Sequence, residues 1–270
     1  FVVSPMEFPG GDIGKIAVCG TVNDLAVGGA KPLWLSAAFV IEEGVEISTL
    51  RRIAASMQNA ADDAGVAIVT GDTKVVGKGS GDGVFITTSG IGVIVQPGDV
   101  AIVNGVLGDH GAAILAARGD MALSTEIPSD CQPLNHLMEA ILSAAPGTRV
   151  ARDATRGGLA SALNEIADAA GVGVEIGEDV LPLRTEVKGV WEILGLDPLY
   201  LANEGTLVIF VPEDQADAAL SAMHATDAGR EAVIIGKATT QHPRTVVMKT
   251  VFGGLRIVDM LVGEQLPRIC

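Results

Sequence analysis

The sequence is poor in aromatic residues and in cysteine. Phe, Trp and Tyr make up 3% of its 270 residues, so a core has to be built from Ala, Val, Ile and Leu. The sequence has three cysteines, Cys19, Cys131 and Cys270, and this small, odd number gives no disulfide framework. Such sparse cysteine usage is typical of a reducing compartment. We therefore expect a cytoplasmic protein.

Positive charge and long apolar runs are also lacking. The 18 Lys and Arg residues face 33 Asp and Glu residues, and the net charge is -15. A nucleic-acid binder needs basic patches, so we expect no nucleic-acid partner. No apolar run is long enough to span a bilayer and no secretory signal is visible, so we expect no membrane partner. A nucleotide-binding enzyme can still be acidic, because carboxylates hold Mg²⁺ and the metal then meets the phosphates.

The chain does contain enough apolar material for two domains. Hydrophobic residues make up 48% of it, and its 34 glycines indicate many tight turns. Pro97-Gly98 is typical of a domain boundary. We expect an N-terminal domain over residues 1–97, a C-terminal domain over 98–260, and a mobile tail over 261–270 that ends in Cys270. Phe1 opens the chain inside an apolar run, and we expect further residues upstream of it.

Hydrophobic periodicity predicts helices and strands in both halves, which favours two α/β or α+β domains. One apolar face from Ser48 to Ala64, followed by Gly65, predicts a helix with a glycine stop. Gly108-Asp109-His110-Gly111 is interpreted as a tight turn before a helix over Ala112–Arg118. The other predicted strands are 66–76, 83–95, 100–106, 207–211, 232–235 and 246–251, and the other predicted helices are 133–144, 158–170 and 214–224.

Two polar runs place an acid beside small residues and are candidates for a metal–phosphate site. They are Thr21-Val22-Asn23-Asp24-Leu25-Ala26 and Thr70-Gly71-Asp72-Thr73-Lys74. Asp24 and Asp72 could supply hard oxygen ligands for Mg²⁺, while Lys74 could reach a phosphate or stabilise developing negative charge. The alternative is that both runs only cap helices or close turns, which is the commoner use of such residues.

A third run, Asp153-Ala154-Thr155-Arg156-Gly157-Gly158, stands directly before a predicted helix and is a candidate anion site. Free backbone N–H groups and the helix dipole favour an anion there, and Arg156 could add charged hydrogen bonds. The run lacks the Gly-Lys-Ser/Thr ending of a Walker A motif, and it is not a Rossmann fingerprint. The alternative is a capped helix with a glycine-rich start.

Two single residues carry further candidate chemistry. Glu204, within Asn203-Glu204-Gly205, precedes a predicted strand and is either a general base or an ordinary loop acid. Cys270 on its loose tail could be modified and carried into a pocket, or be a stray cysteine. The histidines are too scattered for a metal site and are interpreted as surface or loop residues, with His110 the one nearest a plausible site. They are His110, His136, His224 and His242.

Taken in order, these runs resemble the HypE family of hydrogenase maturation proteins, which are PurM-like ATP-binding enzymes related to aminoimidazole ribonucleotide synthetase. The resemblance covers essentially the whole chain. It rests on the runs above, on Phe8-Pro9-Gly10-Gly11-Asp12-Ile13-Gly14, and on the terminal Pro267-Arg268-Ile269-Cys270, which the wider relatives lack. It implies a two-domain PurM-like fold, a homodimer formed through strands of the N-terminal α/β domain, and ATP with Mg²⁺ between the domains. The family's glycine-rich leader lies upstream of Phe1.

The resemblance further implies an ATP-dependent carbamoyl dehydratase that works on its own Cys270. A HypF-type carbamoyltransferase loads the sulfur, ATP activates the amide oxygen, and loss of phosphate leaves an S-cyanide for iron on a HypC–HypD scaffold. Asp24 and Asp72 match the Mg²⁺–phosphate elements. Glu204 is expected to remove an N–H proton, and Lys74 to stabilise the phosphorylated oxygen or to lower the pKa of Glu204. The remaining nucleotide-site residues are Asn23, Thr73, Asp153, Thr155, Arg156 and Gly157.

Two alternatives stay open from the sequence. One is another PurM-like ATP enzyme that acts on a free small molecule, and product formation without Cys270 would favour it. The other is a non-catalytic carrier whose tail docks a partner. The presence of Asp24, Asp72, Lys74 and Glu204 argues against a carrier.

Overall fold

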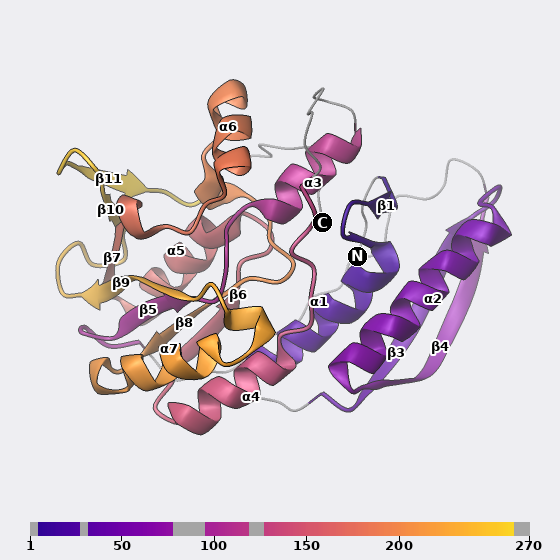
Figure 1. Cartoon of the computed structure of the whole chain (residues 1–270), viewed down its shortest axis with the longest axis horizontal. Helices are drawn as coiled ribbons and strands as arrows, with labels where there is room; N and C mark the ends of the chain where they lie inside the picture. The colour runs from indigo at the N-terminus through magenta and orange to yellow at the C-terminus, as the bar shows by residue number, and fades with distance from the viewer. Residues whose placement is uncertain (1–4, 28–31, 78–94, 119–126, 262–270) are drawn as a thin grey trace.

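Two groups of helices and strands lie side by side in the structure (Figure 1). The structure is a computed structural model that describes residues 5–27, 32–77, 95–118 and 127–261, with the backbone alone for Asp72 and residues 190–194. Residues up to 77 form the smaller group, and residues from 95 onward form the larger one around a single broad sheet. Helices and sheets mix in both groups, which confirms the predicted α/β and α+β class.

The smaller group packs two helices with a two-stranded parallel sheet. Its elements are β1 (Glu7–Phe8), β2 (Gly11–Asp12), α1 (Ile13–Val27), β3 (Trp34–Glu42), α2 (Ile47–Ala64) and β4 (Ala67–Val76). Helix α2 connects the parallel strands β3 and β4, and its buried stripe of Ile53, Met57 and Ala60 packs in one core with residues of α1. Gly65 then adopts a left-handed φ of 68° and ends α2, as predicted.

The larger group is built on a seven-stranded sheet with the order β11-β10-β7-β9-β5-β8-β6. All its strand pairs are antiparallel except β10 with β7. Its elements are β5 (Val100–Val103), α3 (Asp109–Arg118), α4 (Asn135–Ala144), β6 (Val150–Asp153), α5 (Gly158–Ala170), β7 (Gly173–Gly177), α6 (Thr185–Leu194), β8 (Leu207–Val211), α7 (Ala216–His224), β9 (Val233–Thr239), β10 (Val246–Lys249) and β11 (Leu255–Val258), with 3-10 turns at Glu178–Val180, Pro198–Tyr200, Glu213–Gln215 and Asp227–Gly229.

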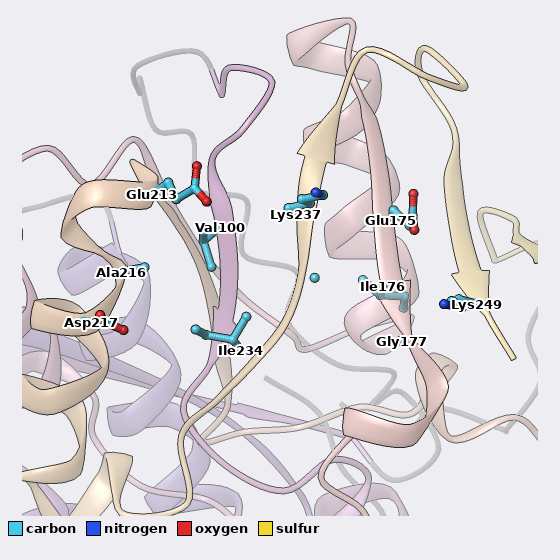
Figure 2. Close-up of a pocket in the computed structure, with 11 residues that line it drawn as sticks. Val100, Glu175, Ile176, Gly177, Glu213, Ala216, Asp217, Ile234, Lys237 and Lys249 are labelled. Carbon is cyan, nitrogen blue, oxygen red and sulfur yellow. The ribbon is translucent and has the colours of Figure 1, made fainter. Parts of the chain in front are cut away.

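Helices cover the two faces of this sheet unequally. On one face α5 contributes Leu159 and Leu163 to a core that includes Phe210 of β8 and Ile176 of β7. On the other face α4 and α7 cover β5, β6 and β8 around Ile209. Since α7 lies over only part of that face, the segment of sheet formed by β7 and β10 stays open beside it (Figure 2).

Helix α1 joins the two groups. It packs against α2 of the smaller group and against α4 and β6 of the larger one. Its buried residues Cys19 and Val22 share a core with Ile114, Cys131 and Ala202 of the larger group. Helix α1 thereby carries the Asn23-Asp24 run into the junction between the groups, and the run lies inside a helix instead of capping one.

Most of the predicted elements are confirmed, some with different ends. Helix α5 and strand β8 have the predicted bounds, whereas α4 and α7 begin two residues later than predicted, at Asn135 and Ala216. β5 ends at Val103 and β10 at Lys249, both earlier than predicted, while β9 runs on to Thr239. The predicted strand over 83–95 falls almost wholly outside the described residues.

The predicted tight turn at Gly108–Gly111 is wrong, because α3 already begins at Asp109. Gly108, with a φ of 85°, ends the preceding bend, and Asp109 in the first turn suits the positive end of the helix dipole. Gly111 lies inside the helix, where an added Cβ would meet the side chain of Leu201 at 3.3 Å.

Among the described residues, no helix is both long and apolar enough to cross a membrane.

We expect Phe210→Ala to destabilise the larger group by about 3–5 kcal/mol, because it empties a site that is fully buried against α5. Phe252→Ala is the matched control, since Phe252 is 96% exposed and its truncation should change stability by no more than about 0.5 kcal/mol. Urea unfolding of the two variants checks this. Equal losses in both would contradict the core assignment.

Candidate functional site

Three of the predicted acids come together where α1, β6 and the loop before β8 meet. β6 pairs with β8 so that Asp153 stands opposite Leu207, and the loop that carries Glu204 therefore lies beside the end of β6. Helix α1 packs against β6 and carries Asp24. Burial, and then the negative charge of Asp24, raises the pKa of Asp153. The three carboxyl groups thus act on one another.

The run that leads into α5 and the loop that carries Glu204 are hydrogen-bonded to each other. The N–H of Ala154 donates to the carbonyl of Thr206 over 2.9 Å, and the N–H of Asn203 donates to the carbonyl of Ala154 over 3.1 Å. Two runs that lie about fifty residues apart in the sequence therefore form one wall of the site.

Glu204 is 3% exposed, and its pKa is raised well above the ordinary value of 4.5. Burial is the largest cause, followed by the negative charges of Asp130 and Asp153. One of the two roles predicted for Lys74 was to lower the pKa of Glu204, whereas the structure raises it. A buried carboxyl group whose pKa is moved upward can exchange a proton nearer to neutral pH, which is the property of a general base or acid.

Side chains from distant elements hold the loop around Glu204. The amide of Asn203 accepts from the N–H of Gly108 at 2.7 Å and donates to the carbonyl of Ala154 at 3.0 Å. The amide of Asn23 donates to the carbonyls of Gln132 and Glu204 at 3.2 and 3.3 Å. The Asn23 side chain, which the sequence placed with the nucleotide, thus bonds to backbone here.

Asp130 is a site residue that the sequence reasoning missed. It is half-buried, and its two carboxylate oxygens accept from the N–H groups of Glu204 and Gly205 at 3.0 and 3.1 Å. The available signal was weak: an acid in the short run between Pro128 and Pro133, which follows neither the helix nor the strand period.

The amino end of α5 has the predicted glycine-rich start. Gly157 and Gly158 have φ values of 75° and 61°. A Cβ on Gly158 would stand 2.4 Å from the carbonyl oxygens of Leu199 and Leu201, so this close approach requires glycine. Within the described residues no side chain caps this helix end, which leaves first-turn N–H groups for an anion. Thr155 is half-buried beside it and Arg156 is exposed.

The Asp72-Thr73-Lys74 run lies apart, on β4. Its residues pair with Ala38, Phe39 and Val40 of β3, and the Thr73 and Lys74 side chains are exposed. β4 stands on the side of the molecule away from β7 and β10 (Figure 1). The structure therefore brings Asp24, Asp153 and Glu204 together, whereas Thr73 and Lys74 stand on a separate sheet.

Two hollows mark the surface of the larger group. One, of about 590 Å³, is lined in part by Asp109, Asp130 and Thr206, and so borders the loop that carries Glu204. The other, of about 510 Å³, lies on the open part of the sheet and includes Glu175 and Lys237 (Figure 2). Within the described part of the chain, neither of these two hollows is lined by a predicted site residue, but the first includes Thr206 of the loop that carries Glu204. We therefore assign the chemistry to the neighbourhood of Glu204.

The cysteines and histidines add no metal site. Within the described residues no group of three or more His, Cys, Asp or Glu side chains is arranged to hold a metal ion. Cys19 and Cys131 are buried free thiols, whereas Cys270 and the rest of the tail after Leu261 lie outside the described residues. His110 is fully buried, at 2.9 Å from the Ser129 hydroxyl through Nδ1, so its interpretation as a surface or loop residue is wrong. The three exposed histidines are His136, His224 and His242.

We expect Glu204→Gln to make the protein more stable at neutral and alkaline pH. A carboxyl group whose folded pKa is raised costs stability once the pH exceeds its unfolded pKa, and this cost is complete above the folded pKa. Gln carries no charge and avoids this cost. The gain should vanish at acidic pH, where Glu204 is protonated in both states.

Urea unfolding of both proteins across this pH range checks the sign. A variant that is less stable than the parent at alkaline pH would show that the ionised Glu204 carboxylate does not destabilise the fold.

Comparisons with known proteins identify the family and the fold. Residues 1–94 match the family described as AIR synthase related protein, N-terminal domain, and residues 96–249 match the corresponding C-terminal domain. A relative from Rhodobacter capsulatus, a carbamoyl dehydratase HypE, is 68% identical and is aligned over 100% of this chain and 82% of its own length.

Solved structures of HypE proteins are also similar to this chain. The hydrogenase maturation protein HypE in complex with ATP has a TM-score of 0.93 at 42% identity, covering 100% of this chain and 85% of that chain. A HypE–HypF complex has a TM-score of 0.90 at 45% identity, covering 97% of this chain and 88% of that chain. With its two-domain PurM-like fold, the chain therefore belongs to the HypE family of carbamoyl dehydratases.

Proposed function

We propose that this chain uses ATP to dehydrate a carbamoyl group carried on the sulfur of Cys270, with Glu204 as the base. The observation that carries the role of Glu204 is its buried carboxyl group, whose pKa is raised by burial and by neighbouring acids. The product is an S-cyanide, the source of a cyanide ligand for the iron of a [NiFe]-hydrogenase. The relative from Rhodobacter capsulatus carries the name of the same activity.

The reaction removes one water from the carbamoyl group. ATP supplies a phosphoryl group to the carbamoyl oxygen, which turns a poor leaving group into a good one. The oxygen then departs within inorganic phosphate, two N–H protons are lost, and the nitrogen forms a triple bond to carbon. Glu204 takes up a proton from the nitrogen, and loss of this proton lets the nitrile form. Lys74 was predicted to act on the phosphorylated oxygen or to lower the pKa of Glu204, but it lies on the separate β3–β4 sheet, and the pKa of Glu204 is raised.

The phosphates of ATP would bind at the amino end of α5. The first turn of α5, which no described side chain caps, presents backbone N–H groups there, although the N–H of Gly158 already donates to the Thr155 carbonyl at 2.9 Å. Thr155 and Arg156 add side-chain donors. The hydrogen bonds of Ala154 with Thr206 and Asn203 place this end directly beside the loop of Glu204. The bound nucleotide would therefore lie next to the loop that carries the base Glu204. Asp153 borders this site, whereas the other two residues predicted for it lie differently: the Asn23 side chain bonds to backbone, and Thr73 is on β4.

The acids at this junction suit a magnesium ion. The negative charge of Asp24 raises the pKa of Asp153 after burial does, and such repulsion between carboxylates is what a bound cation relieves. Asp24 would hold the ion, whereas Asp72, predicted as its second ligand, lies apart on β4. When bound, Mg²⁺ supplies charge neutralisation on the phosphates.

The start of the tail lies at this site. A Cβ on Gly157 would stand 3.5 Å from a methyl carbon of Leu261, the last described residue. Nine residues follow it up to Cys270. An extended chain of that length spans at most about 32 Å, so Cys270 can reach Glu204 from here and also extend outward to partners. Tethering keeps its effective concentration in roughly the millimolar range.

The partners follow from this cycle. A HypF-type carbamoyltransferase loads Cys270, and the solved HypE–HypF complex shows that a relative binds such a protein. A HypC–HypD iron scaffold accepts the cyanide, and the cycle takes place in the cytoplasm. A carrier without catalysis is disfavoured because it has no use for a buried base beside an anion site. An enzyme for a free small molecule would have no need of Cys270.

The chain would act as a homodimer joined through the β3–β4 sheet. Trp34 and Val40 on β3 are 69% and 51% exposed, although they are large apolar residues. A two-stranded parallel sheet with a bare apolar face is rarely stable alone. A second copy of the chain would cover this face, on which Val40 pairs with Lys74.

We expect Glu204→Gln to bind ATP normally but to accumulate the S-carbamoyl form instead of the nitrile. Gln cannot accept the proton, and loss of a general base lowers rates by about 10²–10⁴-fold. Mass spectrometry of the C-terminal peptide checks this, because the nitrile is lighter than the carboxamide by one water. Glu165→Gln is the control, since Glu165 is an exposed acid paired with Arg152. Normal cyanation in Glu204→Gln would remove Glu204 from the mechanism.

We expect Val40→Asp to convert the dimer into monomers. The new carboxylate would stand opposite Lys74 within the sheet, so the strand pair should tolerate it. The contact of Trp34 and Val40 with a second copy would instead lose apolar burial and gain a charge. Phe252→Asp is the control on an exposed aromatic residue of the other group. Light scattering after size-exclusion chromatography gives the molar mass. A dimer that survives Val40→Asp would place the interface elsewhere.

A further inference from the structure

Asp130 binds three successive residues of the loop that carries the proposed base. Its Oδ1 accepts from the N–H of Glu204 at 3.0 Å, and its Oδ2 accepts from the N–H of Gly205 at 3.1 Å. The Thr206 hydroxyl donates to the same Oδ2 at 3.0 Å. One half-buried side chain therefore fixes the backbone on which Glu204 stands.

Burial raises the pKa of Asp130, and the hydrogen bonds that its carboxylate accepts oppose this rise. The three groups bonded to its oxygens are all donors, and hydrogen bonds donated to a carboxylate favour the charged state. The contact is also close in the backbone. A Cβ on Gly205 would stand 1.9 Å from the carbonyl oxygen of Asp130, so no residue larger than glycine fits there without movement.

The charge of Asp130 acts directly on Glu204. The titratable groups that face Glu204 most strongly are Asp130 from the segment before α4, Asp153 from β6, and Cys19 and Asp24 from α1. After burial, Asp130 has the largest influence on the pKa of Glu204, and it raises that pKa. It is also the one of these carboxylates shown bonded to the backbone of Glu204 itself.

We infer that Asp130 is a positioning residue for Glu204: its carboxylate fixes the backbone of residues 204–206, and its negative charge keeps Glu204 ready to take up a proton. This inference rests on the proposed role of Glu204 as the base. Asp130 itself lines the hollow that borders this loop, and it acts on the reaction through Glu204.

The test is Asp130→Asn, which keeps the size of the side chain but removes its charge. We expect the plateau rate of ATP-dependent nitrile formation to fall by about 10–100-fold, as is usual when a group that orients a functional residue is lost. We also expect the acid limb of the pH–rate profile to move to lower pH, because loss of a like charge favours ionised Glu204. A purely structural role would lower the plateau and leave the limb in place.

Two control variants separate charge from packing. Thr206→Val removes one hydrogen bond to Asp130 but leaves the charge, and the acid limb should stay where it is. Asp99→Asn neutralises a buried aspartate elsewhere in the fold, which accepts from the N–H of Gln96 and from Arg149, and should cost stability without moving the limb. If Asp130→Asn is not recovered folded, Asp130→Ser removes the same charge, and the same displacement is expected.

Direct titration of Glu204 distinguishes this inference from the proposed function. Carbon NMR of protein labelled at the Glu carboxyl carbons reports its midpoint, and Glu204→Gln assigns the signal. An unchanged midpoint in Asp130→Asn would overturn the inference, whatever Glu204 does in catalysis. A midpoint that moves down while the acid limb stays fixed would support the link from Asp130 to Glu204 and would instead overturn the role of Glu204 as the base.

Discussion

Hydrogen bonds from distant side chains to the backbone of residues 203–206 set the geometry of the whole site. Asn104 binds the carbonyl of Gly205 at 3.1 Å and the N–H of Leu207 at 2.7 Å. Asn23 reaches the same loop from α1, and Asp130 from the segment before α4. Because buried amides and carboxylates are costly without partners, these bonds form together, and the loop can hold one conformation.

Because the loop is fixed, Glu204 can be buried close to other carboxyl groups. Asp24, Asp153 and Asp130 surround Glu204, and burial together with their charges raises its pKa. Such an arrangement lowers stability, since each carboxylate would be better solvated apart from the others. Sites tuned for proton transfer commonly carry this cost. The amino end of α5 lies beside the same loop. The destabilising cluster of carboxylates and the anion site therefore lie in one small region.

The sequence by itself determined the periodic elements and the family. Helices α2 and α5 each bury one apolar stripe, so their periodicity shows in the residue order, and a left-handed glycine follows each of them. Strand β8 is a short apolar run after a polar loop. The order of the polar runs, ending in Cys270, predicted the family that the comparisons confirm. These features are local or collinear and need no knowledge of packing.

Only the tertiary structure decided which of the candidate residues meet. Helix α1 is buried from two sides, against α2 and against α4 and β6, so no single apolar stripe indicated it. Asn23 proved to bond to backbone, and Asp130 entered the site without any motif. The pKa of Glu204 depends on burial and on charges that lie far away in the sequence. Such long-range burial and proximity arise only when the chain folds, because the residue order alone does not fix distances between separate elements.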